Sequence, residues 1–122
     1  MNCSHGDVIL VRFPKSDFKT YKKRPALVVQ ADIKTGLSQK IVALKTSNLE
    51  RTGPTRVYVP KNSDLGKKMG LQTDSVIVVD NLATILEREM DKRIGKCTKW
   101  FPVADALLKT FGLEKENGRG SS

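Results

Sequence analysis

The fold of this chain follows from one stretch, Ala26-Leu-Val-Val-Gln-Ala-Asp-Ile-Lys-Thr-Gly-Leu-Ser-Gln-Lys-Ile-Val-Ala-Leu-Lys-Thr46. Its two apolar runs, residues 26–31 and 40–46, have the length of strands and are rich in β-branched residues. The connection between them, residues 32–39, is short, and a short connection favours an antiparallel hairpin over a parallel pair. The stretch therefore predicts two neighbouring antiparallel strands.

This hairpin brings two polar residues to the same end of the sheet. If the turn centres near Thr35 and Gly36, paired residues have numbers that sum to about 70 or 71. Arg24 then lies opposite Thr46. A guanidinium group and a hydroxyl group are thus predicted to converge beside the loop that precedes residue 24.

Short apolar runs on both sides of the hairpin extend the sheet. They are separated by turns rich in Gly, Pro and Lys, with no helix between them, which favours a compact barrel over β-α-β units. The remaining predicted strands are residues 8–13, 56–59, 75–79, 82–86 and 93–97. The pair 75–79 and 82–86 is alternatively one bent strand, broken near Asp80 and Asn81. The predicted fold class is mainly β in a single domain.

One helix is predicted at the end of this domain. Pro102 suits its first turn, and Gly112 suits its C-terminal end. Between them four apolar residues follow helical spacing and predict the buried face: Ala104, Leu107, Leu108 and Phe111. Shorter helical pieces are expected near residues 61–65 and 87–92. The domain is expected to span residues 1–113, and the polar tail 114–122 is expected to be disordered.

Charge gives the first indication of function. The 122 residues include 22 Lys and Arg against 13 Asp and Glu, for a net charge of +9. Such an excess attracts polyanions, so the expected partner is nucleic acid or an acidic protein. The sequence shows neither a run long enough to span a membrane nor a secretory signal, which leads us to expect a cytoplasmic protein. Cys3 and Cys97 are accordingly expected to be free thiols.

The loop before the first strand of the hairpin is strongly basic. It reads Lys15-Ser-Asp-Phe-Lys-Thr-Tyr-Lys-Lys-Arg24, with cations interleaved with two aromatic rings. Cations suit the phosphates of single-stranded nucleic acid, and aromatic rings suit its unstacked bases. The alternative is a solvated hairpin tip whose rings fold back onto the core. The candidate RNA-binding residues in this loop are Phe18, Lys19, Tyr21, Lys22 and Lys23.

The chemistry that fits these residues is RNA cleavage by the 2′-hydroxyl of the RNA itself. Arg24 suits the neutralisation of charge on the phosphate, and Thr46 can hold a phosphate oxygen or orient the 2′-hydroxyl. Asp80 offers a carboxylate, although it fits the role of a turn residue equally well. A single histidine, His5, excludes a paired-histidine mechanism. The cysteines and His5 match no usual zinc site, and no phosphate-binding glycine loop occurs.

Four segments in order resemble the MazF/PemK (Kid) family of toxin endoribonucleases. They are Gly6-Asp-Val-Ile-Leu-Val11, Lys23-Arg-Pro-Ala-Leu-Val-Val29, Ile41-Val-Ala-Leu-Lys-Thr-Ser47 and the segment from Gly70 to Ile85. Each is weak alone, but four at similar spacing are fairly specific. The resemblance implies an SH3-like β-barrel with a C-terminal helix, working as a homodimer.

The resemblance also implies an activity and a site. The activity is metal-independent, cofactor-free cleavage of single-stranded RNA that leaves a 2′,3′-cyclic phosphate and a 5′-hydroxyl, inhibited by an antitoxin with an acidic segment. Arg24 and Thr46 match the catalytic arginine and threonine of the family. Asp80 matches an acidic position implicated in some members, and Ser47 can share the hydroxyl role. Arg56 is a further candidate RNA-binding cation.

Two other functions fit the same composition. A non-catalytic nucleic-acid-binding barrel would carry the same basic loop. A toxin that acts on a protein, like the gyrase poison CcdB, would share the barrel without the RNA chemistry. The Arg24 and Thr46 matches favour the nuclease over both.

Overall fold

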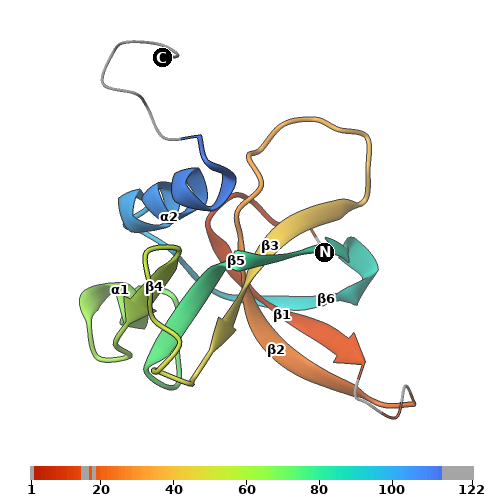
Figure 1. Cartoon of the computed structure of the whole chain (residues 1–122). Coiled ribbons are helices and arrows are strands. Elements are labelled where there is room, and N and C mark those ends of the chain that lie inside the picture. Colours follow the sequence, from red (N-terminus) through yellow and green to blue (C-terminus); the bar gives the residue numbers. More distant parts are fainter. Residues whose placement is uncertain (1, 15–16, 18, 114–122) are drawn as a thin grey trace.

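The computed structural model describes residues 2–14, 17 and 19–113 of the chain. Within these residues the chain forms six strands, two α-helices and one 3-10 helix (Figure 1). In chain order they are β1 (Asp7–Pro14), β2 (Tyr21–Val28), β3 (Gln39–Thr46), β4 (Arg56–Val59), α1 (Asp64–Lys68), β5 (Ser75–Leu86), η1 (Glu87–Glu89), β6 (Met90–Lys96) and α2 (Phe101–Phe111). This confirms the mainly β class and the C-terminal helix.

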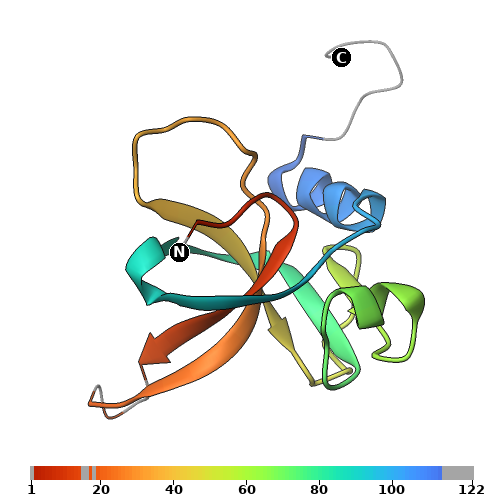
Figure 2. The same cartoon turned by 180° about the vertical axis from the view of Figure 1, so that it is seen from behind.

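The strands form one antiparallel sheet in the order β4-β5-β3-β2-β1-β6. The sheet curls around a core, and α2 packs against β4 and β5 at one end of it (Figures 1 and 2). Strand β1 ends and β2 begins at the other end, away from α2 (Figure 1). The two ends of the barrel thus differ, because the helix lies at one end and the start of β2 lies at the other.

The register between β2 and β3 has the predicted value. Ala26 pairs with Leu44, and Val28 pairs with Val42, so the paired numbers sum to 70. The predicted strand 26–31 was wrong at both ends, however, because β2 runs from Tyr21 to Val28. It begins early because its first residues pair with β1, where Tyr21 lies opposite Pro14. Part of the predicted basic loop is therefore strand.

The segment after residue 74 forms one long strand with an irregular pairing. Leu44 of β3 pairs with Val78 of β5, whereas Ala43 pairs with Leu82. Residues 79–81 therefore have no paired residue on β3, which places Asp80 in a bulge. The alternative prediction of one bent strand is confirmed.

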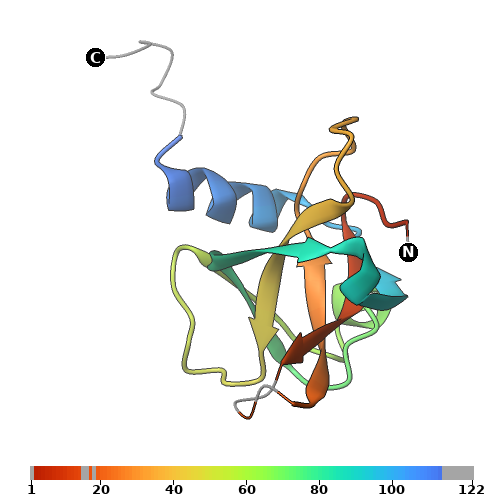
Figure 3. The ribbon, with the colours of Figure 1, turned by 90° about the vertical axis from the view of Figure 1, so that its right-hand side faces the viewer.

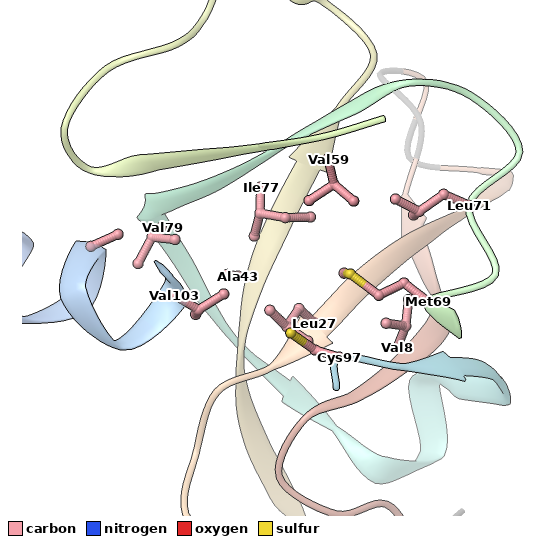
Figure 4. Packing of buried hydrophobic residues seen from close by; sticks show 11 residues of the cluster. Val8, Leu27, Ala43, Val59, Met69, Leu71, Ile77, Val79, Cys97 and Val103 are labelled. Atoms are coloured by element: carbon pink, nitrogen blue, oxygen red, sulfur yellow. The ribbon is translucent and has the colours of Figure 1, made fainter. Parts of the chain in front are cut away.

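Two clusters of buried side chains pack on the sheet. The first lies inside the barrel and includes Val8, Leu27, Ala43, Met69, Ile77 and Val103 (Figure 4). The second includes Ile9, Val11, Val28, Val42 and Met90. Cys97 belongs to the first and Cys3 to the second, and both are free thiols. Because successive residues of a strand point to opposite faces, β1, β2 and β3 each contribute to both clusters.

The helices differ from prediction in their details. Helix α2 begins at Phe101 and ends before Gly112, which has a left-handed φ of 66°, as expected. The predicted buried face was only partly right: Leu107 packs against the core, but the residues that α2 buries fully are Val103 and Ala106. Leu108 and Phe111 are exposed instead. The reason is that the barrel contacts the neighbouring stripe of the helix, so the predicted stripe lies at the edge of the contact.

Other boundaries also shifted. Helix α1 lies at 64–68 rather than 61–65. The helical piece near 87–92 is only the three-residue η1, because β6 begins at Met90 and not at residue 93. The predicted tail, residues 114–122, lies outside the described residues.

Candidate functional site

The seam between β2 and β3 opens at the end of the barrel where β2 begins and β3 ends. The pairing of the two strands stops at Ala26 and Leu44. Beyond that point, Arg24 of β2 pairs with β1 and Thr46 of β3 pairs with β5. Figure 3 shows β2 beginning and β3 ending at the same end of the barrel, away from α2. The predicted partners Arg24 and Thr46 therefore flank an opening rather than a continued ladder.

A hollow of about 200 Å³ lies in this opening, and we call it the seam hollow. Its lining is Lys22, Lys23, Arg24, Pro25, Lys45, Thr46 and Ser47. A second hollow of about 240 Å³ adjoins it and is lined by Phe13, Arg24, Pro25, Leu44 and Lys45. We call this one the Phe13 hollow. The structure thus brings the predicted guanidinium and hydroxyl residues together, with cations on both sides and no carboxylate in either lining.

The side chain of Arg24 is exposed and has no polar partner among the described residues. Its guanidinium group makes no hydrogen bond and no ion pair with any described residue. A guanidinium fork binds two phosphate oxygens at once and stays charged at any physiological pH. Because no carboxylate neutralises it, Arg24 is available to bind a phosphate in the seam hollow.

The hydroxyl of Thr46 is held by the backbone that follows it. Its Oγ1 accepts a hydrogen bond from the N–H of Asn48 at 3.1 Å. A hydroxyl accepts at its lone pairs and donates through its proton, so this bond leaves the proton free. Thr46 can therefore donate a hydrogen bond to an anion in the hollow. Ser47, exposed beside it, adds a second hydroxyl.

Comparison with known families decides which group this chain belongs to. Residues 4–101 match the family described as the PemK-like, MazF-like toxin of type II toxin–antitoxin systems. The chain belongs to this family. The match spans most of the toxin, from just before β1 to the start of α2, and includes every residue of the seam hollow.

Solved structures with the same fold cover nearly the whole toxin. An endoribonuclease in complex with its cognate antitoxin, from a mycobacterial species, has a TM-score of 0.70 at 20% identity, covering 94% of this chain and 100% of that chain. The Mycobacterium tuberculosis toxin MazF-mt6 has a TM-score of 0.69 at 24% identity, covering 89% and 99%. A MazE–MazF structure from Deinococcus radiodurans has a TM-score of 0.68 at 18% identity, covering 92% and 97%. No curated protein matches the sequence.

The predicted RNA-binding residues of the toxin are divided between the seam hollow and the hairpin formed by β1 and β2. Lys22 and Lys23 line the seam hollow, and the Nζ of Lys23 also forms an ion pair with the carboxylate of Asp91 at 3.1 Å. Tyr21 is exposed on β2, and Lys19 is exposed in the turn before it. Phe18 lies outside the described residues. The described part of the hairpin thus presents one exposed ring and several cations beside the hollow.

The structure places Asp80 with Arg56 and not with Arg24. The Nε and Nη2 of Arg56 donate to the two carboxylate oxygens of Asp80, each at 3.2 Å. Hydrogen bonding from Arg56 holds the pKa of Asp80 below its ordinary value. Neither residue lines the seam hollow or the Phe13 hollow. A carboxylate paired with a guanidinium is a poor proton acceptor, so Asp80 is better placed to orient Arg56 than to act as a base.

A variant of Asp80 tests whether its carboxylate only orients Arg56 or takes part in the reaction. Asp80→Asn is expected to lower the RNA cleavage rate by about tenfold at most, since the lost group only orients Arg56 at an exposed site. Single-turnover rates of Asp80→Asn and Arg56→Ala measure this directly. A loss as large as that of an Arg24 variant would instead place Asp80 among the reacting groups.

Other candidate chemistry does not converge on the hollow. His5 packs edge-on against Trp100, the residue just before α2, with ring centroids 4.1 Å apart. In the described part of the chain, no group of three or more His, Cys, Asp or Glu side chains could hold a metal ion. Neither helix in that part is long and apolar enough to cross a bilayer.

Sequence reasoning missed Phe13 and Lys45, which the structure adds to the site. Phe13 gives the neighbouring hollow an aromatic wall, and Lys45 lies in the linings of both hollows. A signal for Lys45 was present, because it is a charged residue that interrupts an otherwise apolar strand directly before Thr46. Phe13 gave no signal, because an aromatic residue at the end of a strand is ordinarily part of the core.

Proposed function

We propose that this toxin is a metal-independent endoribonuclease that cuts single-stranded RNA. The observation that supports it most strongly is that Arg24, unpaired within the described residues, and Thr46 share one hollow whose lining holds several cations and no carboxylate. A site that only bound RNA would need the cations but not a free hydroxyl donor next to a guanidinium. The fold shared with solved endoribonucleases agrees with this function.

The proposed reaction uses the nucleophile that RNA carries. The 2′-hydroxyl loses its proton to water as its oxygen forms a bond to phosphorus, the bond from phosphorus to the 5′-oxygen breaks, and the departing oxygen takes up a proton from water. The products are a 2′,3′-cyclic phosphate and a 5′-hydroxyl. Negative charge grows on the phosphate oxygens in the transition state, where Arg24 neutralises it and Thr46 donates a hydrogen bond.

The lining of the seam hollow suggests where the acceleration comes from. It offers neither an imidazole nor a carboxylate as a conventional general base. We therefore attribute most of the rate to in-line positioning of the 2′-hydroxyl and to neutralisation of phosphate charge. Lysines 22 and 23 hold the adjoining phosphates of the strand.

The proposed partners follow from charge and from the family. We propose that an antitoxin inhibits this toxin by laying an acidic segment over the basic hollows, which would exclude RNA. A mycobacterial relative in fold was solved in complex with its cognate antitoxin. We further propose that the toxin works as a homodimer in the cytoplasm.

The decisive test is the chemistry of the products. The purified toxin is incubated with labelled single-stranded RNA in excess EDTA, and the new ends are identified by mass spectrometry. The proposal predicts discrete fragments that end in 2′,3′-cyclic phosphate and begin with 5′-hydroxyl. Fragments with a 5′-phosphate, cleavage that stops in EDTA, or a shifted band without cleavage would each refute it.

A further inference from the structure

A third hollow lies beyond Lys45, and the proposed reaction does not yet use it. Its volume is about 330 Å³, and its lining is Leu10, Pro25, Lys45, Gly70, Gln72, Lys92 and Ile94. We call it the Gln72 hollow. It shares Pro25 and Lys45 with both the seam hollow and the Phe13 hollow. The three hollows therefore meet at these two residues.

The strand register builds one wall of the Gln72 hollow. Pro25 pairs with Leu10 of β1, and Leu10 pairs with Lys92 of β6. Lys45 of β3 comes directly after Leu44, the last residue of β3 that pairs with β2, and it lines the same hollow as Pro25. A row of paired residues thus crosses β2, β1 and β6, and Lys45 adjoins it from β3, so that the apolar floor of Pro25 and Leu10 has a lysine on each side.

The turn before β5 supplies the opposite wall. Gly70 has a left-handed φ of 72°, and a Cβ atom there would lie 2.2 Å from the carbonyl oxygen of Ile94. Only glycine allows the turn to come this close to β6. The close approach brings Gln72, two residues later, into the lining beside Lys92.

Lys45 is the unusual residue of this arrangement. It is half-buried, and its ammonium group has no hydrogen bond or ion pair with a described residue. Burial lowers its pKa, because the charged form loses solvation. A buried cation without a counter-ion costs stability, and an anionic ligand would offset that cost.

The other polar groups of the Gln72 hollow are also uncommitted. Within the described residues, neither Gln72 nor Lys92 makes a side-chain hydrogen bond or ion pair, and no carboxylate is in the lining. The neighbouring carboxylate, Asp91, is paired with Lys23. The hollow therefore offers two cations, one amide and an apolar floor to a ligand.

We propose that the Gln72 hollow binds the nucleotide adjacent to the cleaved phosphodiester, and that Lys45 binds the phosphate that links this nucleotide to the one in the seam hollow. This inference rests on the proposed function for the identity of its ligand. A volume of about 330 Å³ is at the small end of ligand sites, which suits one nucleotide. The apolar floor contacts the base, Gln72 hydrogen-bonds its edge, and Lys92 binds the next phosphate.

The first test measures binding without cleavage. A 2′-O-methyl RNA oligonucleotide cannot supply the nucleophile, so its affinity is measured by fluorescence anisotropy across a salt series. Lys45→Met is expected to weaken binding about tenfold and to reduce the salt slope by about 0.7, the value for one phosphate contact on a single strand. Lys92→Met is expected to reduce the slope by a similar amount.

Two controls make this result specific. Lys34→Met removes one cation from the exposed loop between β2 and β3 at the other end of the barrel, and is expected to leave the affinity within about twofold. Lys45→Arg is expected to restore most of the affinity. Thermal unfolding is expected to show Lys45→Met at least as stable as the wild type, because the variant removes an unpaired half-buried charge.

The second test asks whether the Gln72 hollow reads a base. Cleavage sites of the wild type and Gln72→Ala are mapped on one long RNA. The variant is expected to cut with the same end chemistry but to lose preference at one position beside the cleaved bond.

An unchanged site pattern, with wild-type affinity and salt slope in the Lys45 and Lys92 variants, would overturn this inference. If Arg24 still proved essential in that case, the proposed function would stand. A wild-type protein that neither bound nor cut RNA would refute both.

Discussion

Arg24→Ala is expected to abolish RNA cleavage, with a loss of about 10³-fold or more in the single-turnover rate. The guanidinium belongs to the lining of the seam hollow, has no carboxylate partner among the described residues, and is the one group there that can bind two phosphate oxygens in a plane. Removing it leaves the growing charge of the pentacoordinate phosphate without its main neutralising group. The measurement is the cleavage rate of a short labelled RNA at saturating enzyme.

The structure also indicates why this loss would be specific. Arg24 is exposed and contributes no described hydrogen bond or ion pair, so its removal is expected to leave the unfolding temperature within a few degrees. Lys23→Ala is the matched control, since it removes an adjacent cation of the same hollow and is expected to cost about tenfold or less. Arg24→Lys is expected to recover only part of the rate, because an ammonium group cannot bind two oxygens in one plane. Full activity in Arg24→Ala would remove the proposed mechanism.

Thr46→Ala is expected to reduce the same rate by about 10²-fold, the cost of one hydrogen-bond donor aimed at transition-state charge. The backbone N–H of Asn48 fixes the oxygen of this hydroxyl at 3.1 Å, so the donor is oriented before RNA binds. The effect is expected in the rate at saturation rather than in affinity, because the bond strengthens as charge develops.

Two further variants separate the hydroxyl from the shape of the side chain. Thr46→Ser keeps the donor and is expected to retain activity within about tenfold, whereas Thr46→Val keeps the shape and is expected to resemble Thr46→Ala. Ser47→Ala tests whether the neighbouring hydroxyl shares the role, and is expected to have the smaller effect. If Thr46→Val cut RNA at the wild-type rate, the hydroxyl would have no part in the chemistry.

The part of the site that lies on one hairpin could be predicted from the sequence. A short connection between two apolar runs limits the register to one or two choices, and the sum of 70 places Arg24 across from Thr46. The opening of the seam at that point was not predictable in this way. It depends on β1 and β5 drawing the two strand ends apart, and their pairing is set by residues far away in the sequence.

Features built from several distant elements escaped sequence reasoning for the same reason. The face of α2 that is buried depends on where the barrel surface lies, so Val103 and Ala106 were missed while the more apolar stripe beside them was chosen. The Gln72 hollow needs four strands and the turn at Gly70 in one place. Asp80 was predicted as a catalytic residue from its position along the chain, but its pairing with Arg56 depends on the bulge in β5.

The most direct measurement is a crystal structure of the toxin with a short single-stranded RNA whose 2′-oxygens are methylated. A phosphate is expected in the seam hollow, with oxygens within about 3.2 Å of both the guanidinium of Arg24 and the Oγ1 of Thr46. RNA bound to another face, or a phosphate held by Arg56 with the seam hollow empty, would contradict it.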